Sequence, residues 1–137
     1  MRGLVDTDAP HLGLEDGRSQ NVLSLTTEAV IGLNPDFMFV MEPGHIEALQ
    51  EDPVLSQMDA VRNGRIKVSP RGAHVWGNRA VELALTPLWL ATELHPDLFP
   101  REDLINEAKS FYADFFKAEL TIEQVEDILS GGWSASP

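Results

Sequence analysis

Four side chains between residues 71 and 79 have the chemistry to hold a charged ligand with an aromatic part. Arg71 and Arg79 carry guanidinium groups, which pair with carboxylates or phosphates. Trp76 offers a flat aromatic face, and His74 offers an imidazole that can donate a hydrogen bond or bind a metal. Each residue also has a plainer explanation, because loops carry solvated charges and a tryptophan ring is often part of a core. The segment 71–79 is therefore the first candidate binding site.

The residues around this segment predict that it is a loop at one end of a sheet. Residues 66–69 form a short strand that Pro70 closes, and Gly72 and Gly77 interrupt regular structure after it. In open α/β sheets, ligands bind outside the carboxyl ends of the strands, so this position suits a ligand contact. Glu82 follows the loop, and we interpret it as an acid in the first turn of a helix rather than as a ligand contact.

Glu28 is a second charged residue at the start of a predicted helix. Thr26 or Thr27 can cap this helix, and Pro35 ends it because proline cannot continue a helix. Glu28 lies in the first turn, where the helix dipole favours a negative charge. Residues 37–41 follow as an apolar run without alternation, which predicts a strand covered on both faces.

The remaining segments are predicted to be mostly helical. Asp52-Pro53 can open a second helix within 45–61. In the apolar segment 80–94, Pro87 introduces a kink or starts a new turn with Thr86 as its cap. Residues 101–116 are amphipathic, and the predicted buried face consists of Leu104, Ile105, Ala108, Phe111, Tyr112 and Phe115.

The end of the chain adds one more predicted helix, which Thr121 caps. Gly131-Gly132 follows as its C-terminal cap. The aromatic residues at helical spacing are expected to be core residues; they are Trp89, Phe111, Phe115 and Phe116. We expect a loop or flexible arm over 1–22, a single lobe over 23–131 and a tail over 132–137.

The composition excludes several functional classes. The chain has 137 residues, 10 Lys+Arg against 22 Asp+Glu, and a formal net charge of −12. This charge argues against nucleic acid or an anionic membrane surface as a partner. No segment is apolar over the ~20 residues needed to span a bilayer. The absence of cysteine excludes disulfides and thiolate metal sites.

No arrangement of residues suggests catalysis, so we expect no enzyme activity and no built-in cofactor. The sequence lacks the H-E-x-x-H, G-x-S-x-G and phosphate-loop patterns, and no nucleophile–base pair stands out. Asp6, Asp8 and His11 are oxygen and nitrogen ligands close in sequence, but their clustering in a predicted arm is better explained by chance than by a metal site.

The order of these elements predicts an α/β fold. It is one Rossmann-like lobe with a small parallel sheet flanked by helices and a helix-rich C-terminal half. Two strands make a thin sheet, and its exposed edge would invite pairing with another chain. We therefore also expect a homo-oligomer or a domain-swapped arrangement.

Four segments in order resemble one family of transport proteins. They are residues 25–40 (LTTEAVIGLNPDFMFV), residues 60–68 (AVRNGRIKV), residues 76–99 with WG, LWLA and LHPDLF, and residues 111–131 with FYADFF, LTIEQ and ILSG. The chain is thereby identified as similar to the substrate-binding proteins that feed iron–siderophore, haem and cobalamin ABC importers. These are class III, helical-backbone binding proteins, and the resemblance runs from about Asn21 to Gly131.

The resemblance implies a binding function outside the cytoplasmic membrane, in the periplasm or the extracellular space. Members of this family have two α/β lobes around a ligand, and this chain resembles the C-terminal lobe only. Glu28 matches the glutamate that docks on an arginine pocket of the membrane permease. The loop with Arg71, His74, Trp76 and Arg79 corresponds to the ligand-contact region, where His74 would bind haem iron or hydrogen-bond a chelate. No resident metal is implied.

The first lobe, the connecting helix and the first strand of the second lobe have no counterpart in the chain, and Met1 to Asp6 lack the apolar region of a secretory signal. Either these parts have been removed or the chain is a separate, truncated reading frame. The alternative function is therefore a truncated, self-associating lobe without ligand-binding activity.

Overall fold

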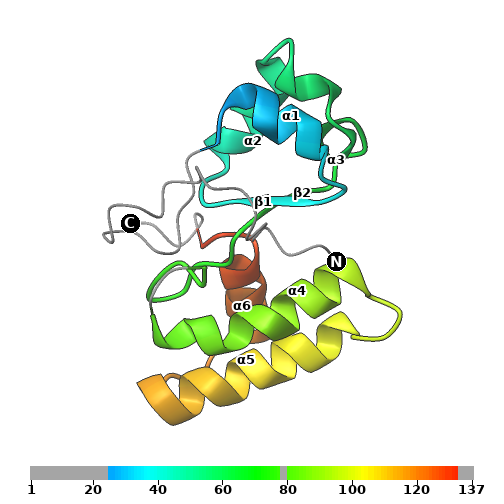
Figure 1. Cartoon of the computed structure of the whole chain (residues 1–137). Coiled ribbons are helices and arrows are strands. Elements are labelled where there is room, and N and C mark those ends of the chain that lie inside the picture. Colours follow the sequence, from blue (N-terminus) through cyan, green and yellow to red (C-terminus); the bar gives the residue numbers. More distant parts are fainter. Residues whose placement is uncertain (1–24, 78–79, 133–137) are drawn as a thin grey trace, which may run out of the picture.

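The computed structural model describes residues 25–77 and 80–132, and these form three layers (Figure 1). A two-stranded sheet lies in the middle, with the helices α1–α3 over one face and α4–α6 over the other. This arrangement confirms the predicted α/β class with a small parallel sheet and a helix-rich C-terminal half. Within the described residues, no helix is long and apolar enough to cross a membrane.

The first layer is built from short helices that end at local sequence signals. Its elements are α1 (Thr27–Leu33), α2 (Gly44–Glu51), the 3-10 helix η2 (Leu55–Gln57) and α3 (Asp59–Arg62). The side chain of Thr26 caps α1 by accepting a hydrogen bond from Ala29 N at 3.3 Å. Asp52 Oδ1 accepts bonds from Val54 N and Leu55 N, each at 2.8 Å, so the Asp-Pro pair does open a new helical turn.

The sheet consists of β1 (Met38–Val40) and β2 (Ile66–Val68), which pair in parallel with Met38 opposite Ile66. Met38 and Val40 pack with Ile66 toward α1–α3. Phe39 faces the opposite layer, where its ring meets Trp89 edge-on at 5.7 Å. The expectation of a strand covered on both faces is wrong for Phe39, which is 44% exposed, because α4 covers that face only in part.

The second layer contains η3 (Val81–Leu85), α4 (Thr86–Leu94), α5 (Arg101–Phe116) and α6 (Ile122–Leu129). Pro87 lies in the first turn of α4, as a new turn requires, but Thr86 is not the cap. Its hydroxyl donates to Trp76 O at 2.9 Å instead. Thr121 and Gln124 form a capping box at the start of α6, as the sequence predicts for Thr121.

The main core lies between the helices of the second layer. It includes Trp76, Trp89, Leu104, Ala108, Phe111, Tyr112 and Val125. The prediction of buried aromatic residues fails at the end of α5, where Phe115 is 68% and Phe116 40% exposed. The helix continues there past the neighbours that cover Leu104 and Phe111, so the same helical face becomes open to solvent.

Candidate functional site

The candidate loop leaves β2 and is attached to the end of α6 by its backbone. Arg71 N donates to Ile128 O at 2.9 Å, and Trp76 N donates to Pro70 O at 2.9 Å. Gly132 lies so close to Arg71 that a Cβ at position 132 would overlap the Arg71 carbonyl. The loop is thus held at Arg71 and at Trp76 by backbone bonds before any side chain contributes.

The carboxylate of Glu82 holds the middle of the loop. Glu82 is fully buried in η3, and it accepts hydrogen bonds from Ala73 N at 2.7 Å and His74 N at 3.0 Å. It also accepts a hydrogen bond from the hydroxyl of Tyr112 at 2.7 Å. A buried carboxylate is strongly destabilising unless donors surround it, and these three hydrogen bonds compensate for its burial. Glu82 lies in the first turn of η3 as expected, but sequence reasoning missed its contact with the loop.

Trp76 is part of the core beneath the loop rather than part of its surface. Its ring is completely buried, and Nε1 donates to the Tyr112 hydroxyl at 3.1 Å. The ring therefore presents no open face in this structure. Trp76 is a core residue, which was the plainer of the two explanations for it. Trp76, Tyr112 and Glu82 form a continuous buried chain of hydrogen bonds that ends at the loop backbone.

Tyr112 stays protonated well beyond the pH at which a free tyrosine ionises. Burial raises the pKa of Tyr112, and the hydrogen bond that it donates to the Glu82 carboxylate raises the pKa further. The bond that it accepts from Trp76 acts in the opposite direction but does not outweigh these effects. Tyr112 is consequently a permanent donor to Glu82 at physiological pH.

The loop also presents a polar surface to solvent. The side chain of His74 is 71% exposed, and its Nδ1 lies 3.8 Å from Glu82 Oε2. Arg71 is half-buried at the start of the loop. Arg79 lies outside the described residues, as do Asp6, Asp8 and His11. Of the predicted ligand-contact residues, the structure describes Arg71, His74 and Trp76 in one loop, and among these three the side chain of His74 is the one that projects largely into solvent.

A pocket of about 550 Å³ adjoins the loop and ends against α5 and α6. Its walls are mainly apolar and include Ala73, Tyr112, Phe116, Leu120 and Ile128. Arg71, Glu123 and Asp127 add charge among its lining residues. The volume lies within the ~300–1,000 Å³ typical of pockets for small organic ligands. Within the described residues, no group of three or more His, Asp or Glu side chains could hold a metal ion.

Glu28 lies on a different layer from this pocket. It is an exposed residue in the first turn of α1, which lies across the sheet from α5 and α6 (Figure 1). Its own backbone N–H and the Thr26 side chain lower the pKa of the Glu28 carboxyl by hydrogen bonding. Glu28 therefore presents an exposed negative charge on a layer that is separate from the pocket.

Comparison with known proteins identifies the fold. No protein-family model matches the sequence. The Molybdate-binding protein MolA of Haemophilus influenzae is 27% identical over 96 residues, which are 68% of this chain and 27% of MolA. The crystal structure of a periplasmic solute binding protein from Veillonella parvula DSM 2008 superposes with a TM-score of 0.65 and 24% sequence identity. The superposition covers 84% of this chain and 37% of that protein.

The fold is therefore that of part of a solute-binding protein, and this chain spans well under half the length of either relative. Both relatives are named as binding proteins and neither as an enzyme, in line with the expectation of no catalysis. Neither name mentions a siderophore, haem or cobalamin. The comparisons support the solute-binding fold that the sequence motifs suggested, but they do not identify a ligand for this chain.

Gly72→Ala should disturb the loop specifically. A Cβ at residue 72 would overlap the Tyr112 hydroxyl and come within 2.5 Å of Glu82 Oε1. We expect a loss of about 1–3 kcal/mol in the free energy of unfolding, measured with urea. Gly32→Ala is the matched control because nothing lies within 4 Å of its Cβ and it sits inside α1, so it should be neutral or stabilising by up to ~1 kcal/mol. Equal losses in both variants would contradict the close packing at Gly72.

Titration of Tyr112 should report directly on its contact with Glu82. It is the single tyrosine of the chain, so tyrosinate absorbance near 295 nm has one source. A free tyrosine ionises near pH 10, whereas the pKa of folded Tyr112 is raised. Its contribution to stability is therefore complete below pH ~10 and is lost as the pH rises above that value. We expect no tyrosinate signal until the protein unfolds; a reversible transition near pH 10 in the folded protein would refute the buried contact.

Proposed function

We propose that this chain is the ligand-binding C-terminal lobe of a substrate-binding protein that serves an ABC importer. The observation that carries this proposal is the pocket of about 550 Å³ beside a rigidly held loop, on the fold of a solute-binding protein. Backbone bonds and Glu82 fix the loop, so a ligand would meet preorganised groups at a small entropic cost. Such a protein works in the periplasm or the extracellular space and reaches the membrane through its permease.

We further propose that the ligand is a metal chelate with an organic shell, such as a ferric siderophore, haem or cobalamin. The mainly apolar walls of the pocket suit the organic part of a chelate. Arg71 and Arg79 would pair with carboxylates of the chelate, and His74 would hydrogen-bond it or bind haem iron. Trp76 would support the loop from below rather than stack on the ligand, because its ring is buried.

Molybdate is the second candidate, and the similarity to MolA favours it. A small tetrahedral oxyanion needs converging donors rather than apolar walls. Arg71, Arg79, His74 and the backbone N–H groups of the loop could supply them. Both candidate ligands would contact the same loop, but only the chelate would also use the apolar walls of the pocket. Binding data can therefore separate the two.

A binding panel tests both candidates. We would titrate the protein with ferric siderophores, haem, cobalamin and molybdate by calorimetry, and compare His74→Ala with His45→Ala. Both histidines are exposed, but His45 lies on α2, away from the loop. Losing one hydrogen bond costs about 0.5–1.5 kcal/mol, so His74→Ala should weaken binding by roughly 2- to 10-fold and His45→Ala should not.

Two results of this panel would contradict the proposal. Identical affinities for the two histidine variants would remove the loop from the ligand site. No binding in the panel, together with a melting temperature that falls on dilution, would favour the self-associating lobe without ligand-binding activity. Chelate binding without molybdate binding, or the reverse, would decide between the two ligand classes.

We propose that Glu28 docks on the permease through a carboxylate–guanidinium contact. Its exposure, its lowered pKa and its separation from the pocket suit an ion pair that fixes the register of two proteins. Glu28→Gln keeps the size but removes the charge, and should weaken binding to the cognate permease in nanodiscs by about 10-fold or more.

Glu51→Gln is the control for this experiment, because Glu51 is exposed at the end of α2. It removes the same charge from another element and should leave binding to the permease unchanged. Both variants should melt at the temperature of the parent protein. Equal losses of binding in the two variants would show that only net charge matters and would refute the assigned contact.

A further inference from the structure

Charges of both signs line the pocket beside the loop, and they follow the length of α6. Arg71 lies at the end of this helix, where its backbone N–H donates to Ile128 O at 2.9 Å. Glu123 lies in the first turn of α6, and Asp127 lies about one turn further along. Arg71, Glu123 and Asp127 all line the pocket. A ligand there meets one basic residue at the end of α6 and two acidic residues along it.

The spacing of the acidic residues turns one face of α6 toward the pocket. The lining residues that this helix contributes are Glu123, Gln124, Asp127 and Ile128. Positions three and four apart share one face of a helix, so these residues form a single wall. Val125 and Leu129 lie on the other face and are buried in the main core. The two acids therefore belong to the pocket wall and not to the packing of the core.

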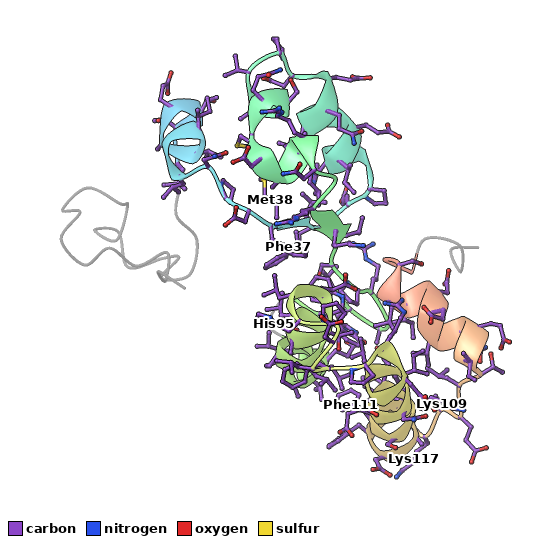
Figure 2. All side chains as sticks on the ribbon, turned by 90° about the vertical axis from the view of Figure 1, so that its right-hand side faces the viewer. Phe37, Met38, His95, Lys109, Phe111 and Lys117 are labelled. Atoms are coloured by element: carbon purple, nitrogen blue, oxygen red, sulfur yellow. The ribbon has the colours of Figure 1, made fainter. Side chains whose placement is uncertain are left out.

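The negative charge of this wall exceeds the positive charge near it. Glu123 and Asp127 form no salt bridge with any residue that the structure describes. Its own backbone N–H and the Thr121 side chain lower the pKa of the Glu123 carboxyl, and the charge of Lys109 lowers it further. Figure 2 shows Lys109 and Lys117 on α5, but neither is among the residues that line the pocket. The described lining thus carries two acidic residues against one basic residue.

The stability of α6 explains one of the two acids but not both. Glu123 lies in the first turn, where the helix dipole favours a negative charge. Asp127 lies in the last turn, where the dipole disfavours one, and this turn contains no basic residue. Like charges four residues apart also destabilise a helix. A cationic group bound beside the two carboxylates would relieve both unfavourable effects.

We propose that the pocket selects ligands in which an apolar body carries a protonated amine, and that Glu123 and Asp127 determine this preference. This inference rests on the pocket being the ligand site, as in the proposed function. The amine forms charge-assisted hydrogen bonds with the two carboxylates, while the apolar body contacts Phe116, Leu120 and Ile128. Among metal chelates, the pocket then favours those with a cationic side chain. It disfavours molybdate, which is a dianion without an apolar part.

Two hydroxamate chelates that differ in a single charge test this preference. Ferrioxamine B carries a free protonated amine, and acetylation turns this amine into a neutral amide without changing the ligands of the iron. We would titrate the full chain with both chelates by calorimetry, at low and high salt. An exposed ion pair is worth up to about 5-fold in affinity, so with two carboxylates we expect ferrioxamine B to bind about 5-fold more tightly or better. High salt should reduce this preference because Glu123 is exposed.

The double variant Glu123→Gln/Asp127→Asn keeps the size of both side chains and removes their charges. Its preference for ferrioxamine B should fall below about 2-fold, because an amine gains no ion pair from neutral amides. The control Glu47→Gln/Glu51→Gln removes two exposed charges from α2 and should keep the preference of the parent protein. Melting temperatures would confirm that both variants fold. An unchanged preference in Glu123→Gln/Asp127→Asn, or an equal loss in the control, would overturn the proposal.

Failure of this inference can be distinguished from failure of the proposed function. Equal affinities for the two chelates would overturn the charge preference and leave the binding function standing. If neither chelate binds, naphthylmethylammonium and naphthoate replace them, because these probes require only the pocket. A preference for the ammonium that Glu123→Gln/Asp127→Asn loses would then support the inference although the chelate function fails. No such preference would overturn the inference as well.

Discussion

The buried carboxylate of Glu82 is the constraint on which the candidate site depends. This carboxylate has been removed from water, and three donors from two separate segments must converge on it: Ala73 N and His74 N of the loop, and the Tyr112 hydroxyl of α5. These donors cannot rearrange independently, because any lost partner leaves a buried charge incompletely bonded. The same contacts explain why residue 72 is a glycine, since only a residue without a Cβ lets the loop approach Tyr112 and Glu82 this closely.

The same constraint connects the loop to the main core. Tyr112 donates to Glu82 and accepts from Trp76, so the position of the loop backbone is set by two side chains of the core. Two contacts that join the sheet to this layer are the edge-on packing of Phe39 against Trp89 and the ion pair of Lys67 with Glu93. Because Lys67 is half-exposed, solvent screens the ion pair on that side.

Local sequence signals predicted the elements well, because their physical causes lie within a few residues. Thr26 and Thr121 cap helices through bonds to backbone groups three residues away, and Pro100 precedes a helix that spans the predicted residues 101–116. The failures all involve distant partners. Whether Trp76 faces a ligand or the core depends on Tyr112, which is 36 residues away, and the exposure of Phe115 depends on where neighbouring helices end. No local pattern encodes these contacts.

The division between fixed and exposed groups also limits where ligand specificity can reside. Glu82, Trp76, Tyr112 and Gly72 all take part in the packing and hydrogen bonding that place the loop, so we expect a change in any of them to disturb the loop itself. His74 contributes its backbone N–H to Glu82 while its side chain remains largely in solvent. The backbone bond persists whatever side chain residue 74 carries, except proline. In the proposed binding function, ligand preference can therefore change at residue 74 without loss of the loop geometry. The buried chain of hydrogen bonds then serves as the scaffold for variable contacts, and Tyr112 is the member of this chain that also lines the pocket.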